Sequence, residues 1–173
     1  VQLAPDDATA WGRLALALRT ASEFAPPPAS ARLLAEARSA AGEAIALDAQ
    51  QPDARLALAM LTPVFGNWLM VEQQVLAILA NAPGHVASLD WLSMVWASAG
   101  LIRAHYPLRL ETVRRDPLHA GYNFRSIYAH WMNGDIAAAD RAGERGLDLW
   151  PGHFATWGAR HGLFNFTGRA DRA

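Results

Sequence analysis

The 173-residue sequence contains no cysteine and no lysine. The absence of cysteine excludes disulfides, thiolate zinc sites and a cysteine nucleophile. All 15 cationic side chains are arginines, which we interpret mainly as the codon usage of a GC-rich bacterium. The net charge is -1 and 18% of the residues are charged. This balance lacks the basic excess typical of proteins that bind nucleic acid directly, so we expect no such partner.

Long apolar runs are also missing. The longest uncharged stretch, residues 56–71, is interrupted by Pro63, Gly66 and Asn67, whereas a membrane-spanning helix needs about 18 or more apolar residues. The first seven residues have neither the basic start nor the apolar centre of a signal peptide. We therefore expect no membrane association, and we place the protein in the cytoplasm, with the periplasm as the alternative.

No motif of a known catalytic or cofactor site is present. The sequence has no GxxxxGK[ST] or GxGxxG phosphate loop and no GxSxG elbow. The acidic residues around 135–148 alternate with Arg141 and Arg145, which is typical of a solvated helix face. We therefore predict that the protein is not an enzyme and needs no cofactor.

What the sequence does have is a 34-residue period. Glycine recurs at this spacing at Gly66, Gly100, Gly134 and Gly168, and proline recurs at it at Pro83, Pro117 and Pro151. A glycine ends a helix cheaply because it adopts the left-handed conformation, and a proline cannot continue the helix that precedes it. Apolar residues between these marks recur at every third or fourth position, as in Val71, Val75 and Ile78. The repeating unit is therefore helix, short turn, helix, short turn.

This unit resembles the tetratricopeptide repeat over essentially the whole chain. Trp11 and Trp157 match the early bulky residue of the family's first helix, and the small residues Ala37, Ala41, Ala44 and Ala139 match its second helix. The resemblance implies an all-α, right-handed α-solenoid of antiparallel helix pairs. We predict one domain over residues 1–173 with about four and a half repeats, at approximately 8–51, 52–85, 86–119, 120–153 and 154–173, the last incomplete.

Several segments depart from the family pattern. About ten extra residues around Pro26-Pro27-Pro28 lengthen the first turn, and we expect these prolines to form a solvated loop, with a polyproline docking element as the alternative. Pro63 is expected to bend a first helix, and Pro107 to delay or kink a second one. His105 replaces an expected alanine.

The two ends of the sequence lack the polar capping helix of a solenoid. Residues 1–5 are interpreted as the tail of an upstream second helix, and residues 167–173 as the start of another. We therefore interpret the sequence as a fragment of a longer chain. Uncapped ends would also allow a homo-oligomer.

Three of the six histidines follow the repeat. His85, His119 and His153 each stand two residues after a repeat proline, so they are spaced by the 34-residue period. Equivalent positions on stacked helix pairs lie roughly 8–10 Å apart, whereas metal ligands converge at about 2 Å from one ion. We therefore interpret these histidines as helix-start residues and predict no metal site.

Most of the seven tryptophans are expected to lie in the core, whereas Trp91 and Trp131 are expected to differ from the rest. We expect Trp11, Trp96 and Trp157 to be core wedges. In the family, first helices line a concave groove that holds a ligand, and the resemblance implies a partner-binding groove formed by Asp90, Trp91, Met94, Phe124, Arg125, Tyr128 and Trp131. Met60 and Arg13 would extend it. The alternative is that this stripe packs against further repeats or a neighbouring chain. The family's lysine- and asparagine-rich carboxylate clamp is not matched.

These observations favour a bacterial protein-interaction scaffold that holds a peptide or helix of a protein partner in its groove. The alternative is a sensor or regulatory repeat region of a larger protein, such as a winged-helix transcriptional regulator. The upstream sequence would discriminate between the two.

Overall fold

The computed structural model describes residues 4–173, which contain nine α-helices and no strand. The helices are joined by short turns, as the tetratricopeptide resemblance implies, and the prediction of an all-α helical-repeat fold is confirmed. The chain forms two compact units, residues 1–88 and 89–173. Because the 34-residue period runs through both units, the single repeat domain stays our prediction.

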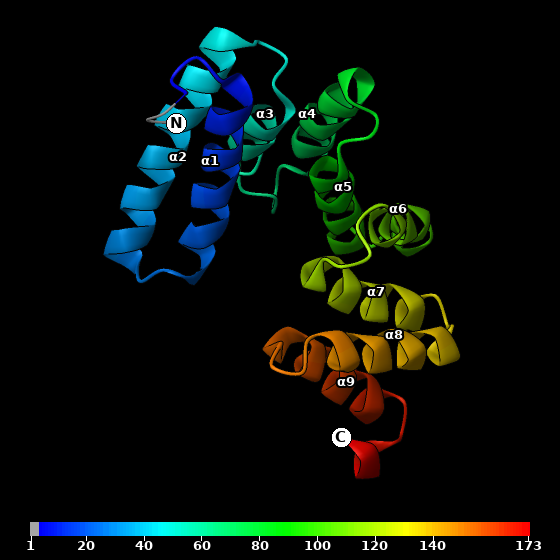
Figure 1. Ribbon diagram of the computed structural model, residues 1–173. Helices are drawn as coiled ribbons and strands as arrows, with labels where there is room; N and C mark the ends of the chain where they lie inside the picture. Colours follow the sequence, from blue (N-terminus) through cyan, green and yellow to red (C-terminus); the bar gives the residue numbers. More distant parts are fainter. Residues whose placement is uncertain (1–3) are drawn as a thin grey trace. The chain divides into compact units, whose positions relative to one another are not determined.

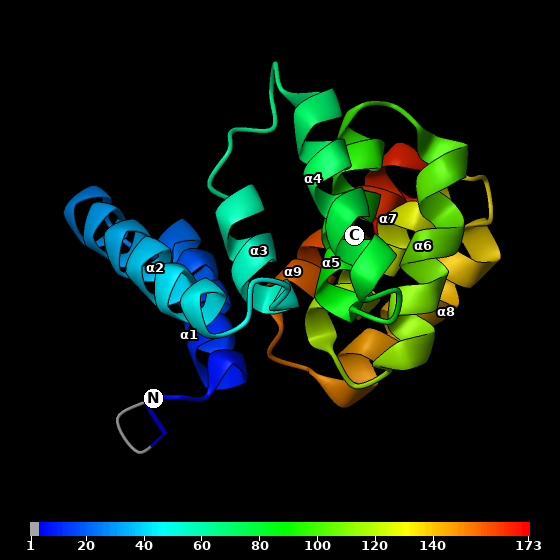
Figure 2. The ribbon, with the colours of Figure 1, turned by 90° about the horizontal axis from the view of Figure 1, so that it is seen from above.

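The first unit is built on a pair of antiparallel helices. Helix α1 (Ala8–Ala21) lies along α2 (Pro27–Leu47), and α3 (Pro52–Ala59) packs against both, as Figures 1 and 2 show. Helix α4 (Trp68–Asn81) follows and contacts α3. Small side chains let α1, α2 and α3 approach closely, because this core consists of alanines: Ala15, Ala40, Ala41, Ala44, Ala54 and Ala57.

The second unit contains most of α5 (Val86–Ser98), then α6 (Ile102–Arg115), α7 (Ala120–Met132), α8 (Ile136–Leu149) and α9 (Phe154–Phe166). Helix α7 packs on α6, α8 and α9. The core of the second unit joins Ile127 of α7 with Ala139 of α8 and with Ala159 and Leu163 of α9, and all four are fully buried. A short 3₁₀ turn, η2 (Ala170–Arg172), follows α9.

The repeat is visible in where helices start and where glycines stand. Helices α3, α5, α7 and α9 begin at residues 52, 86, 120 and 154, so their starts follow the same 34-residue period. The four repeat glycines have φ between 71° and 83°, and the described residues include no other residue with positive φ. The left-handed conformation predicted for these glycines is confirmed, and Gly100, Gly134 and Gly168 each follow a helix end. Gly66 instead lies in the turn before α4, because α3 already ends at Ala59.

We expect Gly134→Ala to destabilise the protein by about 1–2 kcal/mol, because the left-handed conformation is strained for alanine and free of strain for glycine. A new Cβ at Gly134 meets no atom within 4 Å, so the cost is purely one of backbone conformation. The matched control is Gly162→Ala, which lies inside α9, also in open space. It should stabilise by about 0.5–1 kcal/mol. Thermal melts of both variants measure this difference; an equal effect in the two would contradict it.

Two expectations about prolines were wrong, and a third was wrong in part. Pro63 does not bend a helix, because α3 already ends at Ala59. Pro107 does not delay α6 but lies inside it, where the carbonyl that loses its donor belongs to the exposed Arg103 and can be hydrated. A kink at Pro107 stays a prediction. Pro27 and Pro28 open α2 instead of forming a loop or a docking element, since proline is well suited to the first turn of a helix. The extra residues thus mainly lengthen α2.

The expected helix tails at the two ends are also different. Residues 1–3 lie outside the described residues, and residues 4–7 form a turn that leads to Asp7, whose carboxylate accepts hydrogen bonds from the backbone N–H groups of Thr9 and Ala10. After α9, the chain forms the 3₁₀ turn η2 and not an α-helix.

Candidate functional site

The seven predicted groove residues lie on two helices of the second unit. Asp90, Trp91 and Met94 are on α5, and Phe124, Arg125, Tyr128 and Trp131 are on α7. The structure brings part of this set together around a pocket of about 180 Å³. Arg13 and Met60, which were expected to extend the line, belong to the first unit, where Arg13 lies 4.0 Å from Asp53.

The pocket is lined by α5, α6 and α7. Three of its lining residues were predicted from the sequence, namely Met94, Arg125 and Tyr128. The others are Ala97, Ser98, His105, Arg109 and Met132. Its wall therefore combines two methionines and a tyrosine with two guanidinium groups and one imidazole. Trp91, Phe124 and Trp131 do not line it.

Asp90 is the centre of an ion-pair cluster beside this pocket. Its carboxylate accepts a hydrogen bond from the Arg109 guanidinium through one oxygen and pairs with Arg125 through the other at 3.3 Å. Arg109 has a side chain only 3% exposed, and Asp90 is also buried, whereas Arg125 is 30% exposed. The sequence predicts that Asp90 and Arg125 face a partner. In the structure the Asp90 carboxylate is instead paired with both Arg125 and Arg109.

His105 is the second buried polar group of the pocket. It is 2% exposed, its Nδ1 lies 3.3 Å from the Ser93 hydroxyl, and its Nε2 has no hydrogen-bond partner. Burial lowers the pKa of His105 below its ordinary value, and the neighbouring Arg109 lowers it further. The imidazole is therefore held neutral, with one nitrogen unused.

Sequence reasoning missed Arg109 and His105, although the 34-residue register contains a signal for both. Arg109 stands one repeat length after Val75 and one before Gly143, which are both buried. His105 stands in the same way between the buried Val71 and Ala139. A charged or polar residue at a position that is buried in the neighbouring repeats must find a buried partner. Asp90, one repeat length after the buried Leu56, follows the same rule.

An aromatic row runs along α7 beside the pocket. The ring centroids of Phe124 and Tyr128 are 6.5 Å apart, those of Tyr128 and Trp131 6.2 Å, and Trp131 stacks on Phe166 of α9 at 5.5 Å. The three α7 rings are partly buried and pack against the core of the second unit. The row is therefore part interior and part surface.

The repeat histidines act at helix starts, as predicted. His119 caps α7 by accepting a hydrogen bond from the backbone N–H of Tyr122, and His153 Nδ1 lies 2.9 Å from the hydroxyl of Thr156. His85 likewise precedes α5, with its Nδ1 2.7 Å from the Ser88 hydroxyl. No group of three or more histidine, aspartate or glutamate residues within 4–173 is arranged to hold a metal ion.

Asp53, His85 and Ser88 together have the composition of a hydrolase triad. His85 Nε2 lies 2.9 Å from Asp53 Oδ1, and its hydrogen bond lowers the Asp53 pKa although burial acts to raise it. A nucleophile must reach its substrate, however, and Ser88 is completely buried. The same contact recurs between His153 and the buried Thr156 at the equivalent helix start. We therefore assign this arrangement to capping of the repeat.

The expectation that Trp157 is a core wedge was wrong. Its side chain is 55% exposed, and its indole N–H donates to the Pro151 carbonyl at 2.8 Å. Trp11 makes the same bond to Pro5, also at 2.8 Å, and in addition packs against the alanine core of the first unit. Each tryptophan thus links its helix to the preceding turn through a hydrogen bond to the carbonyl six residues earlier. Trp96 is half-buried.

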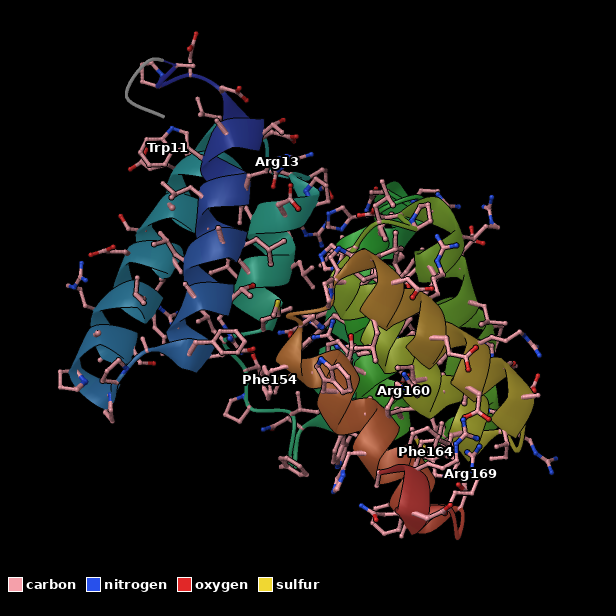
Figure 3. The ribbon with its side chains drawn as sticks, turned by 60° about the horizontal axis from the view of Figure 1, so that its bottom comes forward. Trp11, Arg13, Phe154, Arg160, Phe164 and Arg169 are labelled. Carbon is pink, nitrogen blue, oxygen red and sulfur yellow. The ribbon has the colours of Figure 1, made fainter. Side chains whose placement is uncertain are left out.

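A second pocket, of about 390 Å³, lies on α9 and η2. The guanidinium carbons of Arg160, Arg169 and Arg172 lie 5.2, 5.0 and 4.9 Å from the centre of the Phe164 ring. Figure 3 shows Arg160 and Arg169 beside Phe164 at the end of α9. Arg169 also pairs with Asp140 at 2.6 Å. This arrangement stabilises the turn after α9 through cation–π contacts.

Comparisons with known proteins identify the fold. No family model matches the chain, and no curated protein sequence matches it. Among solved structures, MamA MSR-1 covers 94% of this chain and 88% of its own, with a TM-score of 0.63 and 16% identity. The match to MamA AMB-1 covers 94% of this chain and 90% of that one, with a TM-score of 0.62 and 18% identity. MamA has a tetratricopeptide-repeat fold. The chain, with its 34-residue helix pairs and the left-handed glycines in their turns, therefore has the tetratricopeptide-repeat fold.

Proposed function

We propose that this protein is an interaction scaffold that binds a peptide or helix of a protein partner against helices α5 and α7. The observation that carries the proposal is the pocket between α5, α6 and α7, which the two first helices of neighbouring repeats line with Met94, Arg125 and Tyr128. Aromatic residues and arginine are enriched among the residues that dominate binding energy, and methionine adapts to varied partners.

The partial exposure of the aromatic row supports the same proposal. Tyr128 belongs both to the row and to the pocket. A partner peptide bound along α7 would therefore contact Tyr128 whether it covered the aromatic row or entered the pocket. The Tyr128 ring is half-buried against the core, which fixes its orientation before binding. A side chain that is already ordered loses little conformational entropy when a partner covers its remaining surface.

Among residues 4–173, no helix has the length and apolar character that a bilayer crossing requires.

We expect Tyr128→Ala to weaken partner binding by about 1–3 kcal/mol, or roughly 5- to 150-fold in Kd, because it removes the anchor common to the pocket and the row. Random dodecapeptides displayed on phage are selected on the wild-type protein, and the enriched peptides are titrated by fluorescence anisotropy. The matched control is Leu118→Ala, which removes an exposed apolar side chain of the turn between α6 and α7.

The proposal requires the enriched peptides to lose affinity for Tyr128→Ala and keep it for Leu118→Ala. Circular dichroism and thermal melts show whether Tyr128→Ala retains the helical fold. Equal affinity for the wild type and Tyr128→Ala would place the binding surface elsewhere. A variant as destabilised as a core truncation would show that Tyr128 is chiefly a core residue, and the assignment would fail.

A further inference from the structure

We propose that the pocket between α5, α6 and α7 selects a partner that inserts a carboxylate side chain, glutamate or aspartate, held by Arg125 and His105. The proposal rests on the function proposed above and adds the chemistry of the anchor. The pocket, of about 180 Å³, is smaller than the roughly 300–1,000 Å³ of small-molecule sites. It therefore has the size for one inserted side chain and not for a whole ligand.

The charges around the pocket favour an anion. Two of its lining side chains, Arg109 and Arg125, are guanidinium groups, and none is a carboxylate. Asp90 pairs with both arginines, which leaves one positive charge in excess. His105 adds no charge, since burial lowers its pKa. A partner carboxylate would bring the cluster to neutrality inside a partly dehydrated site, where such a pairing is stronger than in water.

Arg125 is positioned to provide that pairing. Its guanidinium lies 5.1 Å from the centre of the Phe124 ring and contacts Asp90 at 3.3 Å, the longer of the two aspartate contacts. Arg109 remains on Asp90 when Arg125 turns to a ligand, so no buried carboxylate is left unpaired. A guanidinium held by an aromatic face offers its remaining N–H groups in a fixed plane, which suits a carboxylate.

His105 provides the second contact. Its side chain is more than nine-tenths buried, it lines the pocket, and its Nε2 has no partner. An unpaired buried polar atom is costly and gains from a ligand that satisfies it. The Ser93 hydroxyl lies 3.3 Å from both Nδ1 and the backbone carbonyl oxygen of His105. A carboxylate in the pocket favours the arrangement in which the hydroxyl donates to Nδ1, because the neutral ring then carries its proton on Nε2 and donates it to the carboxylate. The other tautomer would favour a glutamine, whose amide donates to Nε2 while its oxygen accepts from Arg125.

The test compares these two anchors directly. Peptides enriched on the wild-type protein are resynthesised with each acidic residue replaced in turn by its amide, and Kd is measured for each pair. We expect one acidic position at which the carboxylate binds about 10- to 100-fold more tightly than the amide, the range of a charge-assisted hydrogen bond. In Arg125→Gln this preference should fall to less than about threefold, because the amide side chain keeps polarity but not charge.

Two further variants separate a specific contact from general electrostatics. Arg103→Gln removes one positive charge from the exposed surface of α6, outside the pocket, and should keep the preference. His105→Phe keeps a ring of similar shape without its nitrogens and should reduce the preference several-fold. Thermal melts establish that each variant is folded. Because Asp90 keeps Arg109 in Arg125→Gln, that variant should melt close to the wild type.

The outcomes distinguish the two proposals. Peptides that depend on Tyr128 but bind equally as acid and amide would overturn the carboxylate anchor and leave the scaffold function standing. A preference for glutamine would also overturn it. A carboxylate preference that survives Arg125→Gln but disappears in Arg103→Gln would show a diffuse surface effect and overturn the anchor as well. If no peptide binds the wild type, both proposals fall together.

Discussion

Asp90→Ala is expected to lower the free energy of unfolding of the second unit by about 3–5 kcal/mol, which is the range for removing one partner of a buried ion pair. Arg109 has a side chain only 3% exposed and would keep its charge without a counter-ion. Arg125, which is 30% exposed, would lose its contact with Asp90 but could turn to solvent. Urea denaturation followed by far-ultraviolet circular dichroism measures the loss.

Two controls identify the cause of that loss. Glu111→Ala removes a carboxylate that is 31% exposed and pairs with Arg114 at 2.7 Å and Arg115 at 2.6 Å. It should change stability little, because ion pairs that water reaches contribute little. Adding Arg109→Met to Asp90→Ala removes the stranded charge and should recover much of the loss. If Asp90→Ala were as harmless as Glu111→Ala, water would be satisfying Arg109, and the cluster would not be buried as described.

The fold could be predicted because the strongest sequence signals depend on backbone geometry. A left-handed residue at each turn requires glycine, and Gly66, Gly100, Gly134 and Gly168 have that conformation. These constraints act locally, so a 34-residue period places helix ends without knowledge of packing. Pro107 shows the limit of such reasoning: whether a proline ends a helix depends on whether the freed carbonyl reaches solvent, which is a property of the folded surface.

The site was predicted only in part, because burial is decided by neighbours outside the local pattern. The resemblance placed Met94, Arg125 and Tyr128 on the helices that line the pocket. It did not reveal that Asp90 faces Arg109 of α6, since that contact joins a first helix to a second one. The 34-residue register did indicate that both side chains are buried, because Asp90 and Arg109 occupy positions that are apolar and buried one repeat earlier, at Leu56 and Val75.

Leu163 and Trp157, both on α9, allow the contribution of core packing to be compared with that of a hydrogen bond between a helix and its preceding turn. The register identifies Trp157 as a bulky repeat residue but does not say which face of α9 is covered. Leu163 is fully buried beside Ile127, Ala139 and Ala159, whereas Trp157 is 55% exposed. The smaller side chain should therefore matter more to stability than the larger one.

Leu163→Ala should cost about 2–5 kcal/mol, since it leaves a cavity among side chains that α7, α8 and α9 hold in place. Trp157→Ala should cost only about 1 kcal/mol, mainly for the lost hydrogen bond from its indole to the Pro151 carbonyl. Trp157→Phe, which also removes that donor but keeps an aromatic ring, should behave like Trp157→Ala. Urea denaturation of the three variants ranks them. A loss for Trp157→Ala as large as that for Leu163→Ala would mean that the indole is covered in solution, because no exposed side chain with a single hydrogen bond contributes so much.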